Sequence, residues 1–240
     1  MTTEFDTAQD GPANTSKQSS PVWFALDLII YVSVMFLIRE IYFSEFNFIT
    51  NGLFWSFTTL LTAAILVRVR YLSWRELGLC LPKDYKQPLI ATGFILVAVP
   101  VFIIIFNLLN DNLGLELAAD QSDKAAPAKF GELAGNWMLF FSIIPFIWIQ
   151  SMLEEVLDRG FMINWIERAL SSNLFATIMA VLIQALIFGF RHSYDISERS
   201  ITVALIGLAM GIGYVAFGRN LWPLIIAHCI FNTMAMAGRV

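Results

Sequence analysis

The sequence predicts an all-α fold, a polytopic transmembrane helical bundle of about seven spanning helices, and two observations carry this prediction. Apolar residues make up 58% of the 240 residues and charged residues only 14%, whereas soluble domains average about 25% charged residues. Apolar runs of about 20 residues, the length that a helix needs to cross a bilayer, also recur along the chain. Runs of this length exclude a β-barrel, whose strands alternate over about ten residues. The lipid bilayer is therefore the first expected partner.

Seven segments meet this length criterion, and each is expected to form one helix of the bundle. In chain order they are residues 22–42, 53–72, 88–109, 137–157, 173–191, 201–217 and 221–237. Residues 1–20 are polar and lack a basic stretch followed by an apolar core, so we expect a disordered tail rather than a signal peptide. Residues 21–240 are then expected to form a single transmembrane domain.

The loops differ in charge, and this difference predicts how the bundle is oriented in the membrane. The loop after the second segment is mainly basic, with Arg68, Arg70, Arg75, Lys83 and Lys86. The long loop 110–136 is mainly acidic, with Asp111, Glu116, Asp120, Asp123 and Glu132. Because Lys and Arg gather in cytoplasmic loops, we place the basic loop and the N-terminus in the cytoplasm. With seven helices, the C-terminus then lies outside.

Composition also excludes some partners and sites. The net charge is −4 and no basic patch stands out, so we expect no nucleic-acid partner. The two cysteines, Cys80 and Cys229, are far apart in the chain and too few for a disulfide framework or a thiolate metal site.

Four ionisable residues follow directly on the apolar fourth segment: Glu154, Glu155, Asp158 and Arg159. Each such group costs about 2.5–3.5 kcal/mol at membrane depth, so they are rare there unless paired or functional. On a helix Glu155 and Arg159 share a face and can pair. Glu154 is rotated by about 100° from Glu155 and stays available. The alternative is that this run is the cytoplasmic end of the fourth helix, with solvated charges.

The only two histidines lie at or within apolar segments. His192 ends the fifth segment, whereas His228 lies in the last segment, four residues before Asn232 and on the same helical face. A single histidine on an apolar helix more often makes a structural hydrogen bond between helices. Two histidines, an asparagine and the available Glu154 on three helices of one bundle instead favour a common site.

Three known designs for cutting peptides within membranes are not matched. The chain has no His-Glu-x-x-His motif for a zinc protease and no Gly-x-Ser-x-Gly motif for a serine protease. An aspartyl pair is only half present, because Gly211-Ile-Gly213 is followed by Tyr214 rather than by aspartate.

A fourth design does match. The chain resembles the CAAX protease and bacteriocin-processing family (also called Abi), which includes the type II CAAX prenyl endopeptidases. The three motifs that carry the resemblance are, in order, Glu154-Glu155-x-x-x-Arg159, Phe188-x-x-x-His192 and His228-x-x-x-Asn232. They lie in a core at about 137–237, and Leu72–Leu79 resembles a segment that these proteins often carry before that core.

The resemblance implies an intramembrane endopeptidase that acts on a protein or peptide in or near the membrane. Glu154 would activate water, and His192, His228 and Asn232 would position that water or stabilise the oxyanion. The ion pair between Glu155 and Arg159 would hold the local geometry. The short loops and polar tail also resemble prokaryotic members, which predicts an integral protein of the cytoplasmic membrane.

The resemblance leaves metal dependence open, because members have been described both as metalloproteases and as glutamate-dependent enzymes. A catalytic zinc would take Glu154, His192 and His228 as ligands. The sequence shows no carboxylate that would orient these histidines, so we expect no firmly bound cofactor. The alternative to a protease is a membrane immunity or scaffold protein that binds a peptide or partner through the same polar pocket.

Two further expectations concern geometry. For Glu154 to meet both histidines, the fourth helix must continue to about Trp165, so residues 151–166 are predicted to be helical and to line a cavity. Asp158 departs from the family pattern, in which the position before the arginine is usually aromatic or apolar. It either lies close enough to Glu154 to alter its ionisation or faces cytoplasmic water.

Overall fold

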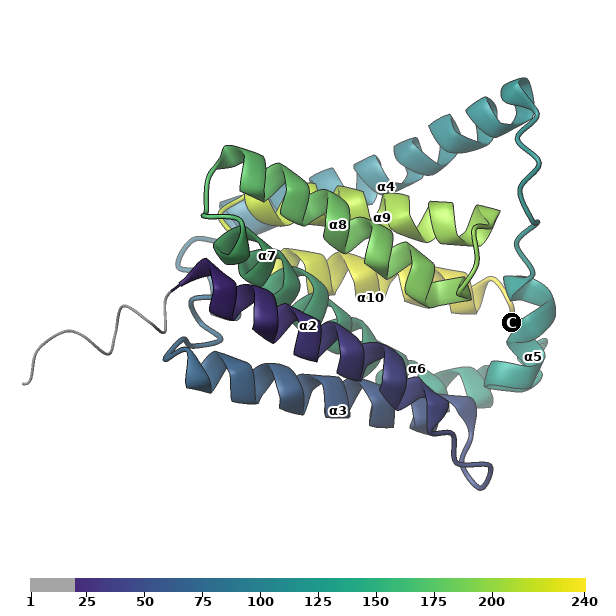
Figure 1. The fold of residues 1–240 in the computed structure, drawn as a ribbon. Coiled ribbons are helices and arrows are strands. Elements are labelled where there is room, and N and C mark those ends of the chain that lie inside the picture. The colour runs from purple at the N-terminus through teal and green to yellow at the C-terminus, as the bar shows by residue number, and fades with distance from the viewer. Residues whose placement is uncertain (1–19) are drawn as a thin grey trace, which may run out of the picture.

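The computed structural model describes residues 20–240, and this part of the chain is a bundle of helices that contains no strand (Figure 1). The predicted all-α fold is confirmed. The predicted disordered tail at 1–20 lies outside the described residues, apart from Ser20. The elements in chain order are α2 (Pro21–Leu37), η1 (Ile38–Glu40), α3 (Phe48–Val69), α4 (Lys86–Leu113), α5 (Ser122–Phe130), α6 (Trp137–Glu154), η2 (Glu155–Ile163), α7 (Asn164–Ala169), α8 (Leu174–Ser193), α9 (Glu198–Ala216) and α10 (Trp222–Ala237).

Within residues 20–240, six helical segments are long and apolar enough to cross a membrane, and α10 is a shorter apolar helix. The surface of the bundle is apolar as well: Leu61 on α3, Val97 on α4 and Leu186 on α8 are each more than 60% exposed. Side chains of this kind lose nothing by facing lipid tails. The chain is therefore an integral membrane protein.

The largest correction to the predicted segments concerns the fourth. Its predicted end at residue 157 is wrong, because α6, η2 and α7 form one continuous helix from Trp137 to Ala169. The charged residues that suggested an end are paired inside the bundle, so they do not need to leave the membrane. At 33 residues this helix is about 50 Å long, well beyond the roughly 30 Å hydrocarbon core.

Two smaller differences have local causes. α3 begins at Phe48 rather than 53, because the Asn47 side chain caps it by accepting a hydrogen bond from the Thr50 amide. The polar Asn51 is buried within α3, where its side chain donates to the carbonyl of Phe43. The short helix α5, in the loop 110–136, was not predicted from the sequence.

One end of the bundle, here called the basic end, gathers the segments 70–85, 170–173 and 217–221. The Leu221 amide donates to the Gly78 carbonyl, and the Asn220 side chain donates to the carbonyl of Cys80. Arg219 forms two hydrogen bonds of 2.7 Å with Glu167, and this carboxylate raises the pKa of the guanidinium. The basic loop is thus folded against the bundle.

The opposite end, here called the acidic end, gathers the segments 41–47, 114–136 and 194–197 and the C-terminus. Arg239, after α10, pairs with Asp123 of α5. Asn110 near the end of α4 donates to Glu198 at the start of α9. In Figure 1 α4 stands away from the other helices at this end, and the chain then runs across the end of the bundle to α5.

Close packing of α8 and α9 fixes the helix that carries His192. A Cβ atom added to Gly189 of α8 would lie 2.6 Å from the Ala204 Cβ of α9. Opposite, a Cβ on Gly207 of α9 would lie 3.1 Å from the Phe188 ring. Small residues let helix backbones approach closely where water cannot drive association. The position of α8 in the bundle is therefore set by its packing against α9.

Candidate active site

The site is built around a change of helix type in the long fourth helix. Glu154 ends the α-helical part, and the next nine residues, Glu155–Ile163, form the π-helical segment η2. π-helical turns are rare, and they are frequently found at functional sites. All nine residues of η2 are buried, and the side chains of Glu155, Asp158 and Arg159 are 0% exposed. The interpretation of this run as solvated charges at a helix end is therefore wrong.

Glu155 connects η2 with the last helix. Its Oε1 atom accepts a hydrogen bond from Arg159 at 3.1 Å and lies 2.7 Å from Nδ1 of His228. The Arg159 guanidinium also lies over the ring of Phe188, 4.3 Å from its centroid. A carboxylate can only accept here, so Nδ1 of His228 carries the hydrogen and Nε2 is left to face the site. Glu155 thus pairs with Arg159, as the spacing of the two residues predicted.

Glu154 is the carboxylate that remains available. Its Oε1 accepts from the Gln150 amide at 3.2 Å, and its Oε2 lies 3.8 Å from Nε2 of His228. It also interacts electrostatically with His192 and Arg191 of α8. Its side chain is 14% exposed, whereas that of Glu155 is fully buried. The structure therefore brings Glu154 together with His228 and places His192 within its electrostatic range.

His192 and Asn232 are held by contacts of their own. Nδ1 of His192 lies 2.6 Å from the carbonyl of Phe188, so this nitrogen donates and Nε2 is free to accept. The Asn232 amide donates to Ser151 Oγ of α6 at 2.8 Å. Ser151 in turn donates to the carbonyl of Ile147. Asn232 thus contacts the helix that carries Glu154 rather than Glu154 itself.

The sequence left open whether Asp158 faces cytoplasmic water, and the structure shows that it does not. It is completely buried, and its Oδ2 atom lies 2.7 Å from the guanidinium of Arg191. Sequence reasoning missed Arg191, although a charged residue directly before His192 on an apolar helix was a usable signal. It also missed Gln150, whose position four residues before Glu154 puts both on one helical face.

A small cavity lies beside Glu154. Its volume is about 20 Å³, enough for one water molecule. The lining combines polar groups with apolar walls: Met35, Arg39, Trp55, Ser56, Thr59, Gln150, Glu154, Leu157 and Arg191. Residues 151–166 are helical, and within them Glu154 and Leu157 line this cavity.

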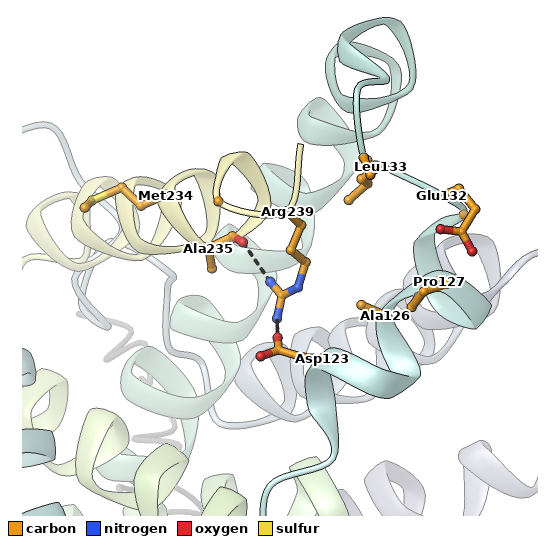
Figure 2. Close-up of a pocket in the computed structure, with 11 residues that line it drawn as sticks. Asp123, Ala126, Pro127, Glu132, Leu133, Met234, Ala235 and Arg239 are labelled. Carbon is orange, nitrogen blue, oxygen red and sulfur yellow. Dashed lines mark hydrogen bonds and ion pairs between the residues drawn. The ribbon is translucent and has the colours of Figure 1, made fainter.

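A larger cavity of about 480 Å³ lies at the acidic end, between α5, the segment 131–134 and the end of α10 (Figure 2). Arg239 crosses it, pairing with Asp123 and donating to the carbonyl of Ala235. None of the site residues predicted from the sequence lines this cavity.

The side chains fit the zinc alternative poorly. Within residues 20–240, no group of three His, Cys, Asp or Glu side chains is placed to hold a metal ion. Glu155 does orient His228 in the way that a carboxylate orients a metal-binding histidine. His192 keeps its Nε2 atom free, because Nδ1 donates to the Phe188 carbonyl, but it does not form such a group with Glu154 and His228.

Comparison with known proteins identifies a family that the motif-bearing part of the chain resembles. Residues 136–234 match the model of the family described as type II CAAX prenyl endopeptidase Rce1-like. No curated protein and no solved structure matches the chain. The matched segment runs from the start of α6 into α10 and contains all three motifs. Residues 136–234 thus match the CAAX protease and bacteriocin-processing family, and this match supports a protease.

Proposed function

We propose that the chain is an intramembrane endopeptidase in which Glu154 activates a water molecule to hydrolyse a peptide bond. The observation that carries this proposal is the cavity beside Glu154, which has room for one water. A carboxylate in a cavity of this size, with Nε2 of His228 at 3.8 Å, has the arrangement of a general base beside a second titratable group.

In the reaction, Glu154 takes a proton from water as the water oxygen bonds to the scissile carbonyl carbon. The electron pair of the carbonyl double bond moves to its oxygen. The bond between carbon and nitrogen then breaks, and Glu154 returns the proton to the leaving nitrogen. The net change is the addition of one water across one peptide bond.

The remaining residues have roles that their contacts support. Glu155 fixes the ring of His228, so that Nε2, when protonated, donates to the developing oxyanion. Asn232 uses one amide hydrogen on Ser151 and has a second one to donate. His192 accepts from the water through Nε2, because Nδ1 is held by the Phe188 carbonyl. Arg159 holds Glu155 in place by donating to its Oε1 atom.

A cleavage assay in proteoliposomes tests this function. The substrate is a synthetic peptide that ends in a prenylated Cys-a-a-X motif, with the same peptide lacking the prenyl group beside it. Glu154→Gln keeps the size of the side chain but removes the base, and we expect a rate loss of about 10²–10⁴-fold. Glu45→Gln, in the exposed loop between η1 and α3, is the matched control and keeps the wild-type rate.

Two results count against the proposal. Equal cleavage by the wild type and Glu154→Gln means that another group is the base. Binding of the peptide without cleavage by the wild type favours the immunity or scaffold alternative instead.

A further inference from the structure

Asp158 and Arg191 form a buried ion pair that the proposed reaction does not use. Their side chains are 0% and 7% exposed, and Oδ2 of Asp158 lies 2.7 Å from the guanidinium. A buried pair of charges adds little stability over apolar residues of similar volume. Because this pair also lies beside the site, it is a candidate for a role in addition to folding.

The pair is incomplete as a structural contact. Oδ1 of Asp158 and Nε of Arg191 have no hydrogen-bond partner among the described residues. Arg191 instead directs its remaining NH1 group at the sulfur of Met35, at 3.1 Å. The carbonyl of Arg191 also accepts from Arg39. Arginine–carboxylate pairs are frequently held by two parallel hydrogen bonds, whereas Arg191 makes one to Asp158.

The location of Arg191 relates the pair to the site. Arg191 lines the cavity beside Glu154 and interacts electrostatically with that carboxylate. It directly precedes His192 on α8, while Asp158 lies in η2, four residues after Glu154. One ion pair thus joins the helix of the proposed base to the helix of the second histidine.

We propose that Arg191, held in place by Asp158, is a positioning residue of this site. The pair fixes the end of α8 against η2, so that His192 faces Glu154. It also holds a positive charge at the wall of the cavity, where the reaction places negative charge. This inference rests on the proposed function, because it assigns Arg191 to the reaction at Glu154.

Kinetics of variants of the pair test the inference with the peptide assay described above. Arg191→Gln is expected to lower kcat about 100-fold, with KM within about threefold, because the charge acts on the reaction rather than on peptide binding. Asp158→Asn leaves the guanidinium in place but unanchored, and we expect a smaller loss of about 10-fold. The double variant is expected to be no slower than Arg191→Gln, because both changes act through one contact. Arg191→Lys, which keeps the charge, recovers at least 10-fold of the loss.

The chain contains a matched control in a second buried ion pair. Asp27 of α2 lies 2.7 Å from Arg70 at the end of α3, with side-chain exposures of 4% and 8%. Neither residue lines the cavity. Asp27→Asn and Arg70→Gln are expected to lower the melting temperature as the Arg191 variants do, but to keep kcat within about threefold. If all four variants lower kcat equally, the role of Arg191 is structural and the inference is wrong.

A second measurement does not depend on cleavage of a substrate. Glu154→Cys, with Cys80 and Cys229 replaced by serine, places one thiol at the cavity, and its labelling rates by anionic and cationic methanethiosulfonates are compared. A fixed positive charge favours the anionic reagent. Adding Arg191→Gln should lower the ratio of the two rates at least threefold, whereas adding Arg70→Gln should not. An unchanged ratio in both overturns the inference.

The outcomes of the two assays distinguish a failure of this inference from a failure of the proposed function. Wild-type cleavage that Glu154→Gln abolishes but Arg191→Gln leaves unchanged refutes the inference alone. Cleavage that survives Glu154→Gln refutes the proposed function, and the labelling ratio then still decides whether Arg191 charges the cavity.

Discussion

Glu154 and Glu155 are adjacent in the chain, but their surroundings give them different tasks. Glu155 is fully buried between Arg159 and His228 and neutralises positive charge there. Glu154 lies at a cavity and has one direct hydrogen bond, from Gln150. Glu155 is thus tied into the fold, whereas Glu154 faces the cavity, where the proposed reaction needs it.

This difference predicts that the two glutamates contribute unequally to stability. Glu155→Gln leaves the guanidinium of Arg159 buried without its countercharge, which costs about 3–5 kcal/mol. For a chain of this size that corresponds to a melting temperature lower by about 6–20 °C. Glu154→Gln should change it by no more than about 4 °C while abolishing cleavage. Thermal unfolding of both variants in the same detergent measures the difference, and equal shifts would contradict the division of tasks.

At the scale of single residues, the sequence predicted which residues lie together in the site, but not all of their contacts. The spacing of Glu155 and Arg159 predicts their pairing, because both lie on one helix. The contact between Asp158 and Arg191 joins residues 33 positions apart. Its formation depends on how α8 packs against η2, which no local pattern encodes.

At the scale of elements, the apolar runs predicted the helices, but the charged residues led to wrong predictions for some helix ends. The fourth helix continues past Glu154 because its charged residues find partners inside the bundle. The π-helical form of η2 was not predictable, since local residue preferences do not distinguish a π turn from an α turn. It depends instead on the packing of η2 against its neighbours.

The approach of α8 to α9 gives a prediction for these two elements. Gly189→Ala places a methyl group against the α9 backbone and should cost about 1–3 kcal/mol through overpacking. It should also slow cleavage, because α8 carries His192 and Arg191. Gly93→Ala on α4 is the matched control, because a Cβ there meets nothing within 4 Å, and it should be neutral or slightly stabilising. The melting temperatures and cleavage rates of the two variants test this prediction. A Gly189→Ala variant with the wild-type melting temperature and cleavage rate would contradict the packing argument.

At the scale of the whole molecule, the cavity beside Glu154 is closer to the acidic end than to the basic end. Its lining includes Arg39 at the end of the first span, Ser56 in the first half of α3 and Arg191 near the end of α8. Arg39 and Arg191 lie next to loops of the acidic end, and Ser56 lies nearer to the acidic end of α3 than to its other end. The side of the membrane on which this end lies therefore determines where a substrate must present its peptide bond.

The charge of the loops predicts that side. Because basic loops stay in the cytoplasm, the segment 70–85 should be cytoplasmic and the acidic end should face outward. Single cysteines at Lys83 and Glu116, both exposed, test this in a background with Cys80→Ser and Cys229→Ser. In intact cells a membrane-impermeant maleimide should label Glu116→Cys alone, and permeabilised cells should label both. Labelling of Lys83→Cys alone in intact cells would reverse the orientation and place the opening of the site toward the cytoplasm.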